Sequence, residues 1–450
     1  MPLEAPAAFS MSGTEPMPQK WWCTFEDAEL GSLIEQALTR NFSLSTVWDR
    51  LAQAEAVARK ADAALWPQAD LDAQAGRTRR RDNLGTTYST LYSAGVAASY
   101  EVDLWSRLAS SQKAAWLDVQ AERDAVDTAA VTLAASVANT WFQLAEAKAL
   151  VRIAEAQTRA NEQVLQIVTA QFNKGIVTAA DVLRQRQLVA STEAQMITAQ
   201  ETVQLLQYRL SVLSGKPPTL AWKHKSIDLP ELPPMPDLGL PAEVLWRRPD
   251  VRADYRRVQA ADQRLAAAVA NQYPRISISA QAETSSASVR DLFDDWLANL
   301  ATNAIQPLFD GEERKAEVQR QEAIVSEVIH DWGQTVLDAL EDVEGALTRQ
   351  QQQAQLLENL RIQLDLARQT YQRNRASYIK GGVDYIRVLE SLVSLQALER
   401  SEVTAERTLI QSRIDLYRSI AGRFDLPQPQ LARISDMTGA ADSEVVITKE

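Results

Sequence analysis

Proline is absent from two long stretches of this chain, and no other feature of the sequence restricts the possible folds as strongly. None occurs in residues 68–216 or 308–426 of the 450. Within these stretches, Ser106–Lys174 and Glu312–Lys380 are 69 residues each; the first also lacks glycine, and the second has two glycines. Proline inside a helix removes a hydrogen bond and clashes with the preceding turn. Both segments are therefore predicted to be single helices about 100 Å long, at about 1.5 Å per residue.

The chain also contains an internal duplication with an offset of about 207 residues. Trp66-Pro67 recurs as Tyr273-Pro274, and Lys174-Gly175 recurs as Lys380-Gly381. Further matches are Leu38 with Leu245, Arg40 with Arg247, Val182-Leu183 with Val388-Leu389, and Leu213-Ser-Gly215 with Ile420-Ala-Gly422. A period of this length is too long for a solenoid and indicates two structural halves.

Each half begins with a predicted helix of 32 residues, Ile34–Leu65 or Pro241–Gln272, and the apolar spacing then changes from helical to alternating. The alternating segments are Ala69–Ala75 and Tyr92–Leu104 in the first half, and Ile276–Ala282 and Trp296–Ala304 in the second. They predict one β-hairpin in each half, with strands long enough to cross a bilayer when tilted.

The long helices are each followed by a glycine turn and a predicted return helix of 39 residues, Ile176–Ser214 or Val383–Ala421. A 39-residue and a 32-residue helix stacked end to end match one 69-residue helix running the other way. The predicted organisation is an N-terminal segment (1–25), a first repeat (26–215), an equatorial linker (216–241), a second repeat (242–422) and a C-terminal tail (423–450). The proline-rich linker is expected to form an irregular belt around a rod.

Composition excludes several classes of function. A net charge of −12 and a pI of about 5.0 argue against nucleic-acid binding. One cysteine (Cys23) and two histidines (His224 and His330) cannot form a disulfide framework, a zinc site or a Cys/His catalytic pair in one chain. No catalytic constellation, metal site or cofactor fingerprint is present, so an enzyme is not expected. No run of 18 apolar residues occurs, so no transmembrane helix is predicted.

Two hairpins supply four strands, too few to close a membrane barrel, whose smallest members have about eight. Lipid cannot hydrogen-bond an exposed strand edge, so hairpins in a membrane must join others until no edge remains. Three copies of the chain supply twelve strands, which are enough to close a barrel. The partly amphipathic strands are consistent with one face toward lipid and one toward a water-filled lumen.

The residues then carry a family resemblance. The sequence resembles the TolC-type outer membrane factors over residues 21–422, and most of all their lipoprotein branch, which serves tripartite drug or metal efflux pumps. The resemblance rests on Trp21-Trp22 with Phe25, Asp27, Leu30 and Leu33-Ile34, on Leu245-Trp-Arg-Arg248-Pro249-Asp250-Val-Arg252, on Pro307-Leu308-Phe309-Asp310-Gly311, and on the Gly-Val and Val-Leu motifs at the turns.

This resemblance implies a homotrimer with a mainly α fold: a twelve-stranded outer-membrane β-barrel continued by a long α-helical barrel through the periplasm. Family members are passive exit ducts that dock a periplasmic adaptor and an inner-membrane pump of the RND type. The implied function is export of drugs, small toxic compounds or metal ions. The partners are those proteins and outer-membrane lipid, without nucleic acid.

One feature departs from the family pattern. Lipoproteins of this branch begin with an acylated cysteine after a signal peptide, whereas MPLEAPAAFS has neither the basic start nor the apolar core of a signal peptide. Cys23 lies inside the segment from Trp21 to Phe25 and is expected to be an ordinary small residue. We therefore expect the export and anchoring segment to be absent from this sequence.

The turns carry the candidate site residues. The turn residues Lys174, Gly175, Lys380, Gly381 and Gly382 are predicted to contact the adaptor. In the family, acidic residues just past these turns constrict the periplasmic entrance, and Arg387 and Glu390 occupy the corresponding positions here. The hypothesis is that Asp181–Arg387 and Arg184–Glu390, with Asp384 and Tyr385 nearby, link neighbouring hairpins and close the entrance. Alternatively, these are solvated surface charges that contribute about 0–1 kcal/mol each.

Arginines and aromatic residues mark the hairpins. Arg77, Arg79, Arg80 and Arg81 are predicted to lie in an extracellular loop at the first hairpin tip, either pairing with lipopolysaccharide phosphates or forming a solvated loop. Aromatic residues predicted for the membrane-interface girdle are Trp66, Tyr88, Tyr92, Trp105, Tyr273, Trp296 and Phe309. By contrast, Trp116, Trp141 and Trp332 are predicted to pack between helices.

Two other functions stay open at this point. A soluble coiled-coil scaffold explains the helices but not the matched alternating segments. A duct for type I protein secretion has the same architecture, because the cargo is chosen by the inner-membrane pump.

Overall fold

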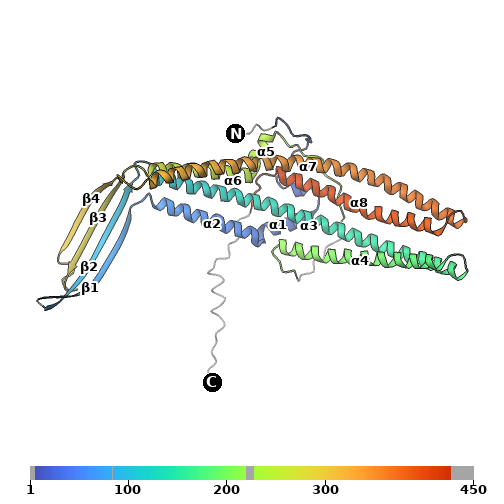
Figure 1. The fold of residues 1–450 in the computed structure, drawn as a ribbon, viewed down its shortest axis with the longest axis horizontal. Coiled ribbons are helices and arrows are strands. Elements are labelled where there is room, and N and C mark those ends of the chain that lie inside the picture. Colours follow the sequence, from blue (N-terminus) through green and yellow to red (C-terminus); the bar gives the residue numbers. More distant parts are fainter. Residues whose placement is uncertain (1–5, 84, 219–227, 427–450) are drawn as a thin grey trace, which may run out of the picture. The chain divides into compact units, whose positions relative to one another are not determined.

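The computed structural model describes residues 6–83, 85–218 and 228–426, and the two repeats contain the same order of elements (Figure 1). The first repeat, after a short helix η1 (Trp21–Phe25), contains α1 (Ala28–Arg40), α2 (Phe42–Ala63), β1 (Gln68–Asp82), β2 (Gly85–Val102), α3 (Arg107–Asn173) and α4 (Ala179–Leu213). The second contains α5 (Pro241–Arg247), α6 (Pro249–Ala270), β3 (Arg275–Ser286), β4 (Trp296–Ile305), α7 (Glu313–Ile379) and α8 (Tyr385–Ile420).

The two long helices are confirmed. Helices α3 and α7 each have 67 residues, and the glycines of α7 do not interrupt it. Ser106 and Glu312 take the left-handed backbone conformation (φ 58° and 69°) just before the respective helix. This conformation is uncommon for residues other than glycine, so its occurrence at equivalent positions shows that both repeats make the same strand-to-helix transition.

The predicted 32-residue helices are wrong as single helices, because each is divided at one residue. Asn41 separates α1 from α2: its side chain accepts the Leu44 amide (3.0 Å) and donates to the Leu213 carbonyl (2.9 Å). Such a side-chain cap satisfies an amide that the helix start leaves unpaired. In the second repeat Arg248 stands at the equivalent position, followed by Pro249 at the first position of α6, where proline is well tolerated.

The two hairpins form one antiparallel sheet in the order β1-β2-β3-β4, as the alternating segments predict for each hairpin. Directly opposed residues share a face. One face is mainly apolar and carries Leu71, Val96, Ala282, Ala298 and Leu300; the other carries Asp70, Asp72, Gln281, Glu283 and Asn299. Among the described residues, β1 and β4 pair on one side only, so the sheet has two free edges.

Contacts divide the chain into two compact units, each of which takes residues from both repeats. Of the described residues, the first takes those within Met1–Trp48, Val126–Pro249 and Leu337–Glu450, and the second those within Asp49–Ala125 and Asp250–Val336. The second unit therefore contains the sheet. Its helices are joined by ion pairs such as Arg252–Asp124 (2.7 Å) and by the contact between Tyr255 and Trp332.

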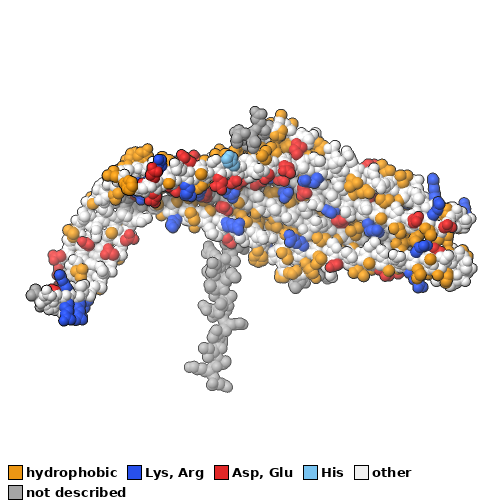
Figure 2. All heavy atoms as spheres, in the orientation of Figure 1, with side chains coloured by type: hydrophobic (Ala, Val, Ile, Leu, Met, Phe, Trp, Pro, Cys, Tyr) orange, Lys and Arg blue, Asp and Glu red, His pale blue; other side chains and the backbone are white. Residues whose placement is uncertain are grey.

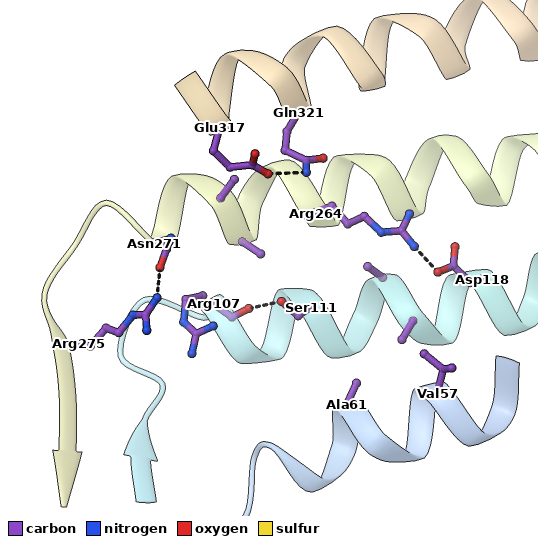
Figure 3. Close-up of a pocket in the computed structure, with 14 residues that line it drawn as sticks. Val57, Ala61, Arg107, Ser111, Asp118, Arg264, Asn271, Arg275, Glu317 and Gln321 are labelled. Carbon is purple, nitrogen blue, oxygen red and sulfur yellow. Dashed lines mark hydrogen bonds and ion pairs between the residues drawn. The ribbon is translucent and has the colours of Figure 1, made fainter. Parts of the chain in front are cut away.

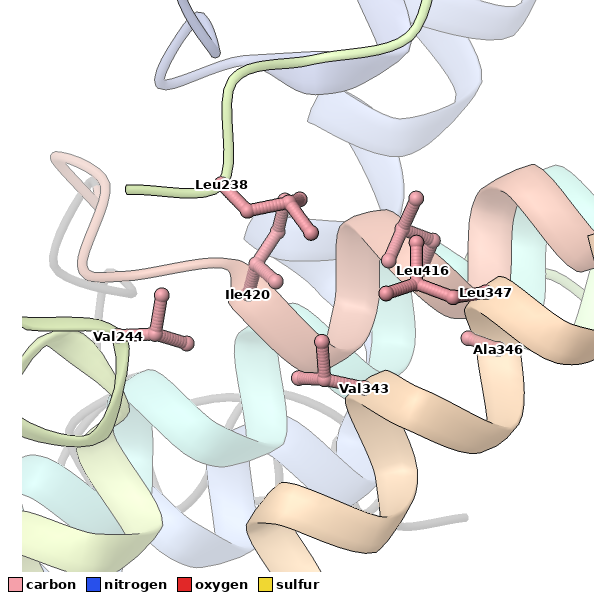
Figure 4. Close-up of a cluster of buried hydrophobic side chains, with 7 residues drawn as sticks. All are labelled: Leu238, Val244, Val343, Ala346, Leu347, Leu416 and Ile420. Carbon is pink, nitrogen blue, oxygen red and sulfur yellow. The ribbon is translucent and has the colours of Figure 1, made fainter. Parts of the chain in front are cut away.

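The core of the first unit surrounds the linker. Buried side chains of α5, α7 and α8 pack against Leu238 (Figure 4): Val244, Val343, Ala346, Leu347, Leu416 and Ile420. The described linker residues, 228–240, contain no helix or strand, consistent with the predicted irregular belt. Residues 219–227 of the predicted linker and 427–450 of the predicted tail lie outside the described residues. Arg413 of α8 donates to the carbonyls of Pro233 (2.6 Å) and Pro234 (2.5 Å), which fixes the linker to α8.

The N-terminal segment packs on the same unit. Trp21 stacks on Tyr417 at 5.5 Å, and Asp27 both caps α1 and accepts the indole N–H of Trp141 (2.7 Å). Trp141 and Trp332 are buried, as predicted for packing residues, whereas Trp116 is 37% exposed. Cys23 is exposed and unpaired.

Within the described residues, no helix is long and apolar enough to cross a membrane. The same residues contain no group of three His, Cys, Asp or Glu side chains arranged to hold a metal ion.

Candidate functional site at the helical turns

The two turns between the long and return helices have the same geometry. Gly175 (φ 72°) and Gly381 (φ 77°) take the left-handed conformation that favours glycine. In each turn this glycine's amide donates to the carbonyl three residues earlier (2.8 and 2.9 Å), and the next amide donates to the carbonyl five residues earlier (3.0 and 2.9 Å). This pair of bonds is the Schellman motif. Lys174 and Lys380 precede the glycines, and Gly382 follows Gly381, so the predicted adaptor-contacting residues lie on two equivalent tips.

Asp181 is held inside the first tip. It occupies the third position of α4, where its carboxylate accepts the amide (3.0 Å) and the hydroxyl (2.7 Å) of Thr178, while the Thr178 hydroxyl accepts the Asp181 amide. This reciprocal arrangement is a capping box. Arg184, one turn along, donates to the same carboxylate at 3.4 Å. Asp181 therefore has a defined role within its own helix.

Tyr385 joins the second tip to the first. It is the first residue of α8, follows the N-cap residue Asp384, and is buried beside Val168 and Val182. Its hydroxyl donates to the Gln185 side chain on α4. Burial raises the pKa of Tyr385, and the negative charge of Asp181 raises it further. The phenol is consequently neutral at ordinary pH and acts as a hydrogen-bond donor.

These residues line one hollow of about 830 Å³ between the tips. Of the predicted gate residues, Asp181, Arg184, Asp384 and Tyr385 contribute to it, whereas Arg387 and Glu390 do not. In the described part of a single chain, Asp181 pairs with Arg184 and not with Arg387, and no ion pair joins Arg184 to Glu390. The predicted pairs are therefore absent between the two neighbouring hairpins of the described chain. As links between hairpins of different copies, they stay a prediction.

Sequence reasoning missed a polar network that joins α3 to α8 further along the hairpins. Asn161 and Gln396 are buried and exchange side-chain hydrogen bonds at 3.0 and 3.4 Å. Gln157 donates to the Glu399 carboxylate (2.8 Å), and Gln185 donates to the Asn161 carbonyl (2.8 Å). Leaving buried amides unpaired costs free energy, so this network fixes how the two hairpins pack. Gln157 and Asn161 are four residues apart on one helix face, which is the only sequence indication of it.

A second missed residue is Tyr378 of α7. Its hydroxyl donates to the Gln171 side chain (2.7 Å), and its ring lies 5.9 Å from that of Tyr385. Tyr378 occupies the position of Phe172 in the duplicated pattern. Tyrosine carries a hydroxyl that phenylalanine lacks, and this difference in the sequence indicated that the two tips differ chemically.

The four arginines predicted for an extracellular loop do not lie in a loop, and their extracellular location stays a prediction. Arg77, Arg79, Arg80 and Arg81 belong to the paired part of β1, since Asp82 still pairs with Gly85. The connection between β1 and β2 is therefore shorter than the loop predicted from the sequence. Of the predicted girdle aromatics, Tyr92 lies in the middle of β2 and is half-buried, whereas the others lie near strand ends and are exposed. Trp105 stacks on Tyr273 at 4.9 Å.

A second hollow, of about 490 Å³, lies among α2, α3, α6 and α7 in the sheet-containing unit (Figure 3). Most of its charged groups are ion-paired: Arg264 with Asp118, Arg107 with Glu101, and Glu317 with Arg320. Arg275 donates to the neutral Asn271 side chain instead. Burial raises the pKa of Asp118 despite the opposing charge of Arg264. Because most of its charges are already neutralised by ion pairs, this hollow is a weaker candidate for a functional site than the tips.

Comparison with known proteins gives the family. The profile of the family described as outer membrane efflux protein matches residues 33–216 and 240–422, that is, most of both repeats. The chain belongs to this family. The resemblance predicted from the sequence motifs is confirmed.

Individual members of this family match nearly the whole chain. The pyoverdine export outer membrane protein OpmQ of Pseudomonas putida is 29% identical over 431 residues, covering 91% of this chain and 89% of its own. The solvent efflux pump outer membrane protein SrpC of Pseudomonas putida is 26% identical over 421 residues, covering 90% and 87%. The solved structure of the outer-membrane channel OprN matches with a TM-score of 0.86 at 24% identity, covering 93% of this chain and 98% of its own.

Family membership decides against the coiled-coil scaffold. The chain is an outer membrane efflux protein, an exit duct located in the outer membrane, and not a coiled-coil scaffold. Family members are channels, in agreement with the expectation that the chain is not an enzyme.

Proposed function

We propose that three copies of this chain form a passive duct that accepts cargo from a periplasmic adaptor and an inner-membrane RND-type pump and releases it outside the cell. The observation that carries the proposal is the sheet: four antiparallel strands with two distinct faces and two free edges in the described chain. An edge of this kind cannot face lipid. Pairing of β1 of one copy with β4 of the next closes twelve strands into a barrel.

The faces of the sheet support this arrangement. Leu71, Leu300 and Trp296 are strongly exposed in a single chain and lie on one face, which suits contact with lipid. Asp70, Asp72 and Glu283 lie on the other face, which suits a water-filled lumen. Barrels of this class alternate lipid-facing and lumen-facing residues in the same way. The long helices then extend the duct into the periplasm as an α-helical barrel.

We further infer that the helical turns form the periplasmic entrance and its gate. Exposed apolar residues at the tips, Ile176 and Ile379, offer a contact surface for an adaptor, together with the lysines and glycines of the turns. Arg387 and Glu390 are exposed in one chain and have no ion-pair partner among its described residues. Both are therefore free to pair with Asp181 and Arg184 of a neighbouring copy.

The inner-membrane pump, and not the duct, selects the cargo. The relatives named above are associated by name with pyoverdine and with solvents. A duct for drugs, small toxic compounds or metal ions agrees with relatives of this kind better than one for type I protein secretion. We assign no single cargo.

Purified protein in planar bilayers tests the proposal. We expect a trimer by native mass spectrometry and a small, steady single-channel conductance. Arg387→Glu should raise the conductance, because it places like charges together at the entrance, whereas Arg184→Lys keeps the charge and should change it little. A monomer without channel activity would refute the duct, and an unchanged conductance for Arg387→Glu would refute the gate alone.

A further inference from the structure

The first strand of the sheet changes its chemistry partway along one face. Successive strand residues point to opposite faces, so the odd-numbered residues of β1 share a face: Ala69, Leu71, Ala73, Ala75, Arg77, Arg79 and Arg81. The first four continue the apolar face of the sheet. The last three put a guanidinium group on every second position of that same face.

Ring contacts confirm this orientation. Tyr88 lies opposite Arg79 in β2, and its ring lies 5.3 Å from the guanidinium carbon of Arg77 and 5.8 Å from that of Arg79. Two arginines two residues apart reach one ring only if both lie on the ring's face of the strand. Arg80 lies on the opposite face by the same alternation. The chain therefore supplies a built-in comparison between arginines on the two faces.

The three arginines have no carboxylate partner among the described residues. Their cross-strand partners on this face are Thr90, Tyr88 and Thr86, which carry no charge. In the space-filling view, basic side chains gather at the end of the sheet that holds the β1–β2 turn (Figure 2). Three unneutralised cations in a row thus adjoin an apolar surface, an arrangement that attracts an anion with an apolar portion.

Their height in a membrane follows from strand geometry. Arg77 lies eight residues beyond Ala69, about 26 Å along the strand at about 3.3 Å per residue. Heights are measured from Ala69, where the apolar face of β1 begins. With strands tilted by about 40°, Arg77 lies about 20 Å and Arg81 about 30 Å above Ala69 along the membrane normal. The apolar band of an outer-membrane barrel is about 25 Å tall. The three arginines therefore straddle its outer edge, at the depth of lipid headgroups.

We propose that Arg77, Arg79 and Arg81 form a binding site for the phosphate groups of the outer-leaflet lipid, lipopolysaccharide. This inference rests on the proposed function, because it requires the apolar face of the sheet to contact the membrane. Guanidinium groups bind phosphate through two parallel hydrogen bonds, and the neighbouring apolar face receives the acyl chains. Tyr88, under two of the arginines, holds them toward the headgroups.

Another source of negative charge needs to be separated from lipid. The segment between β3 and β4 carries Asp291, Asp294 and Asp295. In a closed barrel, β4 of one copy pairs with β1 of the next, so these carboxylates are the protein groups that compete for the arginines. Pairing with them would stabilise the trimer without any lipid.

The test compares the triple variant Arg77→Gln/Arg79→Gln/Arg81→Gln with the single variant Arg80→Gln and with Asp294→Asn/Asp295→Asn. Trimers purified in detergent are titrated with bis-phosphorylated lipid A, with the same lipid stripped of phosphate, and with inorganic phosphate, and bound lipid is counted by native mass spectrometry. Basic residues near anionic lipid each contribute roughly fivefold to affinity, so the triple variant is expected to lose on the order of 100-fold.

The proposal predicts that wild type and Arg80→Gln bind bis-phosphorylated lipid A equally, and that removal of the phosphates abolishes the difference from the triple variant. Equal binding by all variants would overturn it. Binding of inorganic phosphate as tight as that of bis-phosphorylated lipid A would also overturn the proposal, because it would mean that the lipid portion is not recognised. If the triple variant and the aspartate variant both lose the trimer, the arginines pair between copies and the proposal is wrong. Unchanged single-channel conductance of the triple variant separates failure of this site from failure of the duct.

Discussion

Arg413 is the side chain whose replacement most directly tests how the linker is held. It is 2% exposed, its guanidinium donates to the carbonyls of Pro233 and Pro234 and to the Gln350 side chain (2.8 Å), and it lies 5.8 Å from the ring of Tyr417. Burial lowers the pKa of Arg413, but arginine stays protonated in proteins. We predict that Arg413→Met releases residues 228–240 from α8 while the helices stay folded.

The expected magnitude comes from the bonds that are lost. Hydrogen bonds from a charged donor contribute about 1.5–3 kcal/mol each, but removing the charge also removes the cost of burying it. The main remaining cost is the buried carbonyl of Pro233, left without a donor, at about 1–3 kcal/mol. For Arg413→Met we therefore expect the free energy of local opening to fall by about 2.5 kcal/mol. At about 1.4 kcal/mol per factor of ten, the linker should open on the order of 60-fold more often.

Hydrogen exchange measured by mass spectrometry on peptides covering residues 228–240 reads this opening directly. The Asp237 amide donates to the Glu15 carbonyl and the Leu238 amide to the Ser12 hydroxyl, so both report on the linker. Arg413→Lys keeps the charge without the planar fork of donors, and its exchange rate should fall between those of wild type and Arg413→Met. Arg418→Met, at an exposed position of the same helix, is the matched control. Unchanged exchange in Arg413→Met, or the same acceleration in Arg418→Met, would refute the assigned role.

Three further changes test other parts of the chain. Asn41→Ala should destabilise the junction between α1 and α2 by about 1–2 kcal/mol, seen as faster exchange near Leu44, because it removes a helix cap. Gly13→Ala should detach the N-terminal segment and expose residues 10–17 to protease, because a Cβ there would lie 1.9 Å from the Met235 carbonyl oxygen. Tyr385 holds its proton more tightly in the folded chain than in the unfolded chain. Its ionisation therefore does not affect stability near pH 7, but it lowers stability as the pH rises above the ordinary tyrosine pKa of about 10. Ultraviolet titration of wild type against Tyr385→Phe should show one late-titrating phenol, and a Tyr385 pKa at or below 10 would contradict this.

Features set by local chemistry were predictable from the sequence. The absence of proline predicted α3 and α7 to within a few residues, because helix length depends on what interrupts a helix. The alternation in residues 69–75 and 276–282 predicted the hairpins, because period-two spacing fits only a strand with two different faces. Gly175 and Gly381 predicted the turns, because few other residues take a left-handed conformation without cost.

Features set by contacts across the fold were not predictable. Asn41 lies inside a segment without glycine or proline. The helix stops there because the Asn41 side chain caps α2 at the Leu44 amide and donates to the Leu213 carbonyl, which is far away in the sequence. The aligned charges of Asp181 and Arg387 suggested an ion pair between neighbouring hairpins, but the capping box around Thr178 uses Asp181 within its own helix. Arg387 is then left exposed, which sequence spacing alone does not indicate.

The comparison of Asn41 with Arg248 shows how the two repeats came to differ while keeping one architecture. They are equivalent positions, and both side chains donate to a carbonyl at the end of the return helix: Asn41 to Leu213 at 2.9 Å and Arg248 to Ser419 at 3.2 Å. Arg248 reaches further and also pairs with Asp342 of α7 at 3.1 Å, which the shorter amide cannot do. The helix break in the first repeat depends on the Asn41 cap, whereas in the second it also depends on Pro249, which fits only at the start of a helix. The second break should therefore survive replacement of its polar residue, and the first should not.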